Sequence, residues 1–93
     1  MKDLRKRRRI LALLALRIRS QRLHPDVLTR RYLGHLVVDH QVKPEHAVQL
    51  LIRGLPVPVI ALMVKDGRMS TGEVRLLARG ELPWEWMIQQ GRG

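Results

Sequence analysis

Cysteine and phenylalanine are both absent from this 93-residue chain. The lack of cysteine excludes a disulfide framework and thiolate chemistry, and it favours a reducing compartment. Aromatic residues make up 3% of the sequence, as Tyr32, Trp84 and Trp86. Hydrophobic residues nevertheless make up 45%, so the chain should fold around leucine, valine, isoleucine, methionine and alanine, a composition typical of packed helices.

Long apolar runs are lacking as well. Residues 10–16 (ILALLAL) follow a basic stretch, as the apolar part of a signal peptide would. This run is far shorter than the roughly 20 residues that cross a bilayer. Arg17 and Arg19 follow it directly, without a small-residue cleavage site. We therefore expect a soluble, cytoplasmic protein with no membrane partner.

Negative charge is scarce in the first third of the chain. Residues 1–31 carry 11 lysines and arginines against two aspartates, a net charge of +9, whereas residues 32–93 carry seven against six acidic residues. The whole chain has a net charge of +10. A basic segment beside a nearly neutral body is typical of proteins that bind an anionic partner, most often nucleic acid.

The apolar spacing and the helix-breaking residues predict an all-α fold. A chain of this length forms one domain. We expect a compact single domain of five to six short helices, built from stacked helical hairpins and containing a helix-turn-helix. Residues 1–9 would form a basic N-terminal arm and residues 10–90 the helical domain. The helices are predicted over roughly residues 4–22, 25–39, 44–54, 58–65, 71–80 and 84–90, with Pro25 and Asp26 at the start of the second.

Local signals mark several of these ends. Ser70 and Glu73 have the spacing of a capping box, which predicts a helix start. Gly54 and Gly80 are suited to helix ends. Residues 57–64 (VPVIALMV) are ambiguous between helix and strand, because β-branched residues are frequent in this segment.

Two segments of the chain resemble each other at a displacement of 26 residues. Residues 35–54 align with residues 61–80 without a gap, and both segments end in Arg-Gly. Each would form a helix, a short turn and a second helix. The similarity has two open explanations: a true duplication, or two hairpins that share one packing solution.

The first of these hairpins has the outline of a helix-turn-helix. Its second helix, residues 44–53, would lie in the major groove of DNA. There it offers Glu45, His46, Gln49 and Arg53 as polar groups, with Lys43 just before it. Gln can pair with adenine, and Arg with guanine or phosphate. The alternative is an ordinary amphipathic hairpin whose polar face meets only water.

The second hairpin and the segment before it carry a family resemblance. The pattern comprises Leu55-Pro56, Val59, Leu62, Gly67, Met69-Ser70, Gly72, Arg75 and Leu76-Leu77. It resembles the stretch that follows the recognition helix in ParB-type partition proteins, and it covers about a quarter of the chain. An extra residue before Gly67 and Glu73 in place of the usual histidine depart from the family pattern. The resemblance implies DNA binding through a helix-turn-helix at residues 36–53, and it implies no nucleotide hydrolysis.

A rival resemblance involves the first hairpin. Leu33-Gly34-His35-Leu36-Val37-Val38, followed by Val42, Glu45, Ala47 and Leu50-Leu51, is similar to the N-terminal helical repeat of type II secretion ATPases. Some members of that family bind cyclic di-GMP through repeats that begin Arg-Leu-Gly. Tyr32 stands at the arginine position here, so this resemblance implies a helical fold and no ligand.

No pattern predicts catalysis or metal binding. The four histidines, His24, His35, His40 and His46, do not have metal-ligand spacing. The chain has no Ser-His-acid set and no glycine-rich phosphate loop. We therefore expect a protein that is not an enzyme and that needs neither cofactor nor metal.

The favoured hypothesis is a non-enzymatic nucleic-acid-binding protein, with DNA preferred to RNA as the partner. The basic arm would contact phosphates, and the helix-turn-helix at about residues 36–53 would enter the groove. The expected contact residues are Arg5, Lys6, Arg7, Arg8, Arg9, Arg30, Arg31, Lys43, His46, Gln49 and Arg53.

The alternative hypothesis is a helical protein-interaction or adaptor module. It would dock on a larger protein partner, or on RNA, through its basic segment. A homodimer is compatible with either hypothesis, because most helix-turn-helix proteins dimerise, although the sequence shows no separate dimerisation helix.

Overall fold

Six α-helices form wherever the apolar residues recur at three- and four-residue spacing. The computed structural model describes residues 2–91, with the side chains of residues 4–89, and this part of the chain contains no strand. The prediction of one compact all-α domain is confirmed, and residues 57–64 are helical. The helices are α1 (Lys2–Ser20), α2 (Val27–Asp39), α3 (Pro44–Ile52), α4 (Val57–Lys65), α5 (Thr71–Arg79) and α6 (Trp84–Gly91).

Side-chain caps fix the starts of two helices. Ser70 and Glu73 form the predicted capping box at α5, with the Glu73 N–H donating to Ser70 Oγ over 3.1 Å and the Ser70 N–H to Glu73 Oε1 over 2.9 Å. At α2, Asp26 is the N-cap and accepts from the Thr29 N–H at 2.7 Å. That bond, with a second from the Thr29 hydroxyl, holds the pKa of Asp26 below its usual value.

A residue in the left-handed conformation follows each of the first five helices within two positions. Three of these residues are Gly54, Gly67 and Gly80, with φ between 70° and 75°. Glycine adopts this conformation without steric cost. The other two are Arg22 (φ 56°) and Gln41 (φ 58°), and for such residues the conformation costs roughly 1–2 kcal/mol.

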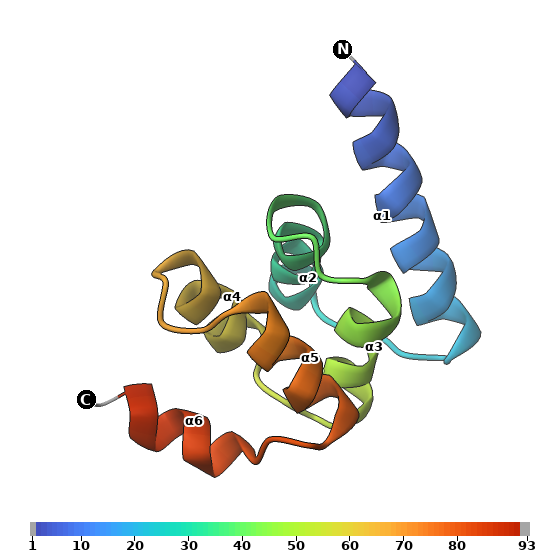
Figure 1. Ribbon diagram of the computed structural model, residues 1–93. Helices are drawn as coiled ribbons and strands as arrows, with labels where there is room; N and C mark the ends of the chain where they lie inside the picture. Colours follow the sequence, from blue (N-terminus) through green and yellow to red (C-terminus); the bar gives the residue numbers. More distant parts are fainter. Residues whose placement is uncertain (1, 92–93) are drawn as a thin grey trace.

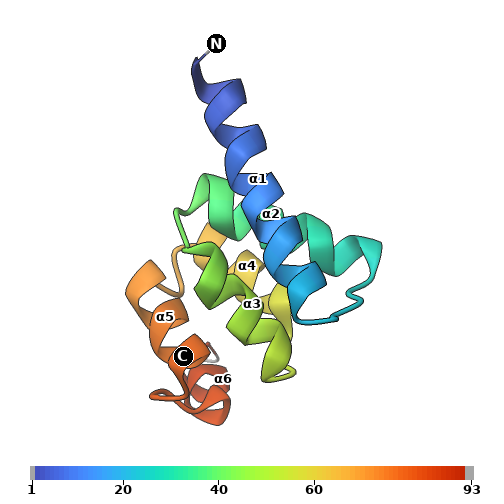
Figure 2. The same cartoon turned by 90° about the vertical axis from the view of Figure 1, so that its right-hand side faces the viewer.

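The helices form two hairpins, which pack so that the corresponding helices of the two hairpins lie side by side. Helices α2 and α3 form the first hairpin, and α4 and α5 the second. Helix α2 lies against α4, and α3 lies beside α5 and runs in the same direction (Figures 1 and 2). The matched left-handed positions, Gln41 with Gly67 and Gly54 with Gly80, are 26 residues apart, so the sequence repeat is also a repeat of backbone geometry.

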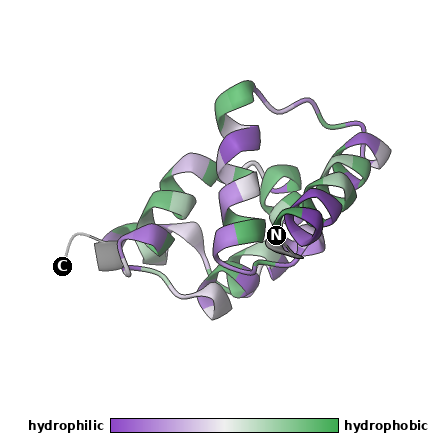
Figure 3. Ribbon diagram, turned by 90° about the horizontal axis from the view of Figure 1, so that it is seen from above, coloured by the Kyte–Doolittle hydropathy of each residue, from purple (hydrophilic) through white to green (hydrophobic). Residues whose placement is uncertain are grey.

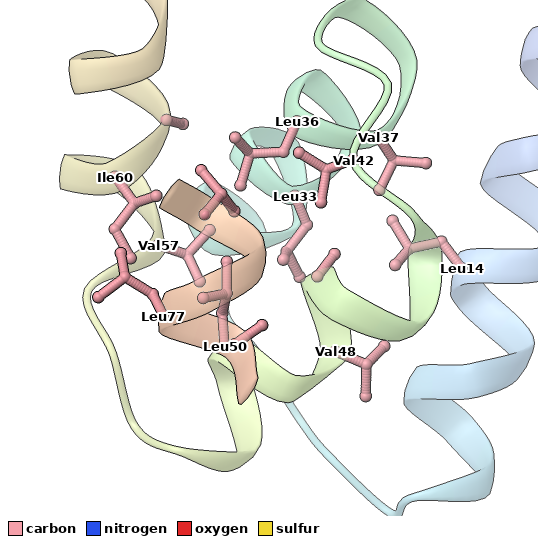
Figure 4. Packing of buried hydrophobic residues seen from close by; sticks show 14 of the residues in the cluster. Leu14, Leu33, Leu36, Val37, Val42, Val48, Leu50, Val57, Ile60 and Leu77 are labelled. Atoms are coloured by element: carbon pink, nitrogen blue, oxygen red, sulfur yellow. The ribbon is translucent and has the colours of Figure 1, made fainter. Parts of the chain in front are cut away.

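The core between the hairpins is wholly apolar. Among the described side chains no polar or charged residue is buried, and Leu33, Leu36, Leu50 and Ile60 are fully shielded from solvent. These residues and Leu77 of α5 belong to one buried cluster, in which Ile60 and Leu77 lie side by side and Leu36 lies beside Val42 (Figure 4). Burial of each such side chain stabilises the fold by about 1.5–3 kcal/mol.

Helix α1 covers one side of the first hairpin and contacts both α2 and α3. Leu14 and Ile18 are buried there, and Ile10 is half-buried. Gly34, in the middle of α2, marks the crossing point. A Cβ at that position would meet Leu11 Cδ2 at 3.3 Å, so the glycine permits the close approach of α1.

Two polar contacts tie the hairpins together at opposite ends of α5. At its start, the Thr71 hydroxyl donates to the His40 carbonyl over 3.2 Å. At its end, Arg53 Nε donates to the Ala78 carbonyl over 3.1 Å. The Arg53 guanidinium also fills the space that a Cβ on Gly80 would need.

Replacing Gly80 with alanine should therefore destabilise the protein more than replacing Gly54. Both glycines have positive φ, but a Cβ at Gly54 meets nothing within 4 Å. We expect Gly54→Ala to lower the free energy of unfolding by about 1–2 kcal/mol. Gly80→Ala should lower it by about 1 kcal/mol more, because it also displaces the bond from Arg53. Urea denaturation of the two variants measures the difference, and equal losses would show that the Arg53 contact contributes nothing.

Candidate nucleic-acid interface

The predicted basic arm is a helical extension of α1 rather than a separate segment. The apolar stripe that packs on the hairpin ends at Ile10, and residues 2–9 continue the same helix beyond the body (Figures 1 and 2). At 1.5 Å per residue this extension is about 12 Å long. Met1 of the predicted arm lies outside the described residues.

Arg7 is the point around which the basic residues gather. On one side of α1 it lines a groove with Lys6 and with Lys43, which comes from the turn before α3. On the other side it lines a second groove with Arg30 and Arg31 of α2. Five of the predicted contact residues, distant in sequence, thus lie around the first half of α1. Figure 3 shows hydrophilic residues at the start of α1 and near the start of α2.

Among the described side chains, those of residues 4–89, no carboxylate lines either of these grooves. Asp39 lies near the second groove, but its carboxylate accepts a 2.8 Å hydrogen bond from His35. Cationic side chains without neutralising partners in the same concave surface produce a positive potential that attracts anions.

The other arginines of the arm lie outside these grooves. Arg5, Arg8 and Arg9 are exposed, and none of them lines either groove. Their spacing of three and four residues places them together on one face of the projecting part of α1, a face that lines neither groove.

Helix α3 lies between α1 and α5 and presents a narrow outer face. Ala47, Val48 and Leu50 are buried, as the spacing predicts. Glu45, Gln49 and Ile52 are exposed, and their spacing of four and three residues places them on one side of the helix. Gln49, a predicted contact residue, is therefore accessible. Glu45 and Ile52 are exposed on the same face but are not among the predicted contact residues.

The remaining two predicted residues differ in their surroundings. His46 is half-buried and lines a groove with Lys43 and with Arg75 of α5. Arg53 is hydrogen-bonded to the end of α5. That contact gives Arg53 a role in holding the hairpins together, and Arg53 lines none of these three grooves.

Sequence reasoning missed two residues at this surface, Gln41 and Arg75. Gln41 lines both the groove beside α1 and the groove between α3 and α5. The 26-residue sequence repeat is the signal that could have indicated Arg75. When the matching helices of the two hairpins pack side by side, the start of α5 lies next to the start of α3.

Other kinds of site are not apparent in the part of the chain that the structure describes. No three His, Asp or Glu side chains there are grouped to hold a metal ion. None of its helices is both long enough and apolar enough to cross a membrane. Comparisons with protein-family models, curated proteins and solved structures give no match.

Proposed function

We propose that this protein is a non-enzymatic nucleic-acid-binding protein whose partner is duplex DNA. The proposal depends mainly on one observation, the convergence of Lys6, Arg30, Arg31 and Lys43 around Arg7 in two grooves that no described carboxylate lines. Such a surface matches the evenly spaced charges of a phosphate backbone.

The first three helices support a helix-turn-helix mode of binding. Helix α1 contacts α2 and α3, and α2 contacts α3, which gives α3 a rigid support. The turn before α3 carries Lys43, one of the cationic residues beside Arg7. In this mode α3 enters the major groove with Gln49 toward the base edges, while the projecting half of α1 follows the phosphates.

The resemblance to ParB-type partition proteins favours the same partner. Its residues, from Leu55 to Leu77, lie in α4 and α5 and the segments before them, and α4 and α5 pack on the first hairpin. This arrangement is compatible with a second hairpin that supports a DNA-reading first hairpin.

Binding to DNA should weaken steeply as salt is added. Contacts from Lys6, Arg7, Arg30, Arg31 and Lys43 would neutralise about five phosphates, which corresponds to a slope near −4.5 for log affinity against log salt on a random duplex. Fluorescence anisotropy between about 50 and 200 mM salt measures this slope. A flat response, or no binding at the lowest salt concentration, would contradict the proposal.

Phosphate contacts and base contacts should separate in two variants. Arg7→Ala is expected to weaken binding to all sequences alike and to reduce the salt slope by about 1. Gln49→Ala should change the preference among sequences, because glutamine pairs with adenine in the major groove. Selection from a random duplex library checks both expectations. Loss of affinity without any change in preference for both variants would exclude base reading by α3.

The alternative function, a protein-interaction module, has one observation in its favour. Leu13 and Leu16, three residues apart on the same side of α1, are 48% and 59% exposed, and neighbouring exposed apolar side chains are a feature of protein-interaction sites. A low-salt preparation distinguishes the functions. Absorbance at 260 nm from bound nucleic acid supports the proposed function, and a stoichiometric protein partner supports the alternative. A second copy of this chain would be recognised by its mass in the same preparation.

A further inference from the structure

A groove of about 240 Å³ lies between the two hairpins, where α3 and α5 start side by side. The first hairpin contributes Lys43 and His46 to its wall, and the second contributes Thr71 and Arg75. The Thr71 hydroxyl donates to the His40 carbonyl over 3.2 Å, so the two hairpins are fixed to each other at this groove.

The side chains of this groove are suited to an anion. Lys43 and Arg75 are exposed cations from different hairpins, and none of the described residues that line the groove is acidic. It also adjoins the groove beside Lys6 and Arg7, because Gln41, Val42 and Lys43 lie between the two grooves and line both of them. A polyanion that follows the start of α1 would therefore pass over the turn before α3 and reach Arg75.

Gln41, on the boundary between the two grooves, has an unfavourable backbone conformation. Its φ is 58°, and the matching residue in the second hairpin, with φ 75°, is Gly67. The second hairpin thus has glycine at this position, whereas the first keeps a polar side chain in spite of the steric cost.

We propose that the DNA-binding surface extends onto the second hairpin, where Arg75 holds the backbone phosphate next to that of Lys43 and Gln41 donates a hydrogen bond to the same strand. This inference is built on the proposed function and adds a contact that a helix-turn-helix hairpin alone does not provide. The two hairpins would then grip one DNA strand at consecutive positions.

Arg75→Ala and Arg79→Ala form a matched pair for testing this contact. Both substitutions remove one positive charge from α5, but Arg79 is absent from the groove and pairs instead with Glu81 at 3.1 Å. We expect Arg75→Ala to weaken duplex binding about tenfold and to reduce the salt slope by about 0.9. Arg79→Ala should change the affinity less than about twofold. Equal effects of the two variants would overturn the inference.

Gly72→Glu tests the same groove without removing any native side chain. A Cβ at Gly72 would meet only Ser70 Oγ, at an ordinary 3.7 Å, and an acidic residue suits the first turn of a helix. The variant should therefore keep its urea midpoint and lose about tenfold or more in DNA affinity, because a carboxylate then lies beside the proposed phosphate. Unchanged affinity in the folded variant would contradict the inference.

Gln41→Gly separates the side chain from the backbone conformation. Glycine accepts the positive φ, so the urea midpoint should stay the same or rise, while DNA affinity falls about threefold to tenfold as one hydrogen bond is lost. Undiminished affinity would remove Gln41 from the contact.

These tests are distinct from that of the proposed function. If the unmodified chain shows no salt-dependent binding, the proposed function fails, whereas binding with equal losses in Arg75→Ala and Arg79→Ala rejects only the second contact.

Discussion

The packing of α1 on the first hairpin determines where most of the positive charge of this protein lies. Leu14 and Ile18 are buried against the hairpin, and Gly34 lets α1 approach α2 closely. Because the helix is rigid, this apolar contact also fixes Arg7, two turns before Leu14, between the grooves that lead to Arg30 and to Lys43. The charge separation that is visible in the sequence therefore becomes a defined cationic surface only through apolar packing.

The two hairpins depend on each other through a few specific contacts. The apolar core between them does not by itself fix the orientation of one hairpin relative to the other, because hydrophobic burial is non-directional. The bonds from Thr71 to the His40 carbonyl and from Arg53 to the Ala78 carbonyl fix both ends of α5 relative to the first hairpin. A partner that binds α3 therefore also lies beside the start of α5. The second helices of both repeats thus contribute to the proposed interface.

Local signals in the sequence were sufficient for most of the fold. Ser70 and Glu73 could be assigned as a cap, and Gly54 and Gly80 as helix ends, because each depends only on residues in the same turn. The environment of the candidate site was less predictable. Arg53 contacts a carbonyl 25 positions away, and Arg75 belongs to a groove formed by two hairpins. Such contacts depend on tertiary packing. The left-handed Gln41 was missed because glutamine seldom adopts that conformation.

The most direct test of the proposed interface is to map it by amide chemical shifts during titration with a short random duplex at low salt. We predict that the shifts change along the first half of α1, at Arg30 and Arg31 of α2, from Gln41 to Gln49, and at the start of α5. Helix α6, which lies away from α1 (Figure 1), should remain unchanged. Changes confined to α4 and α6, or no changes at all, would contradict the account.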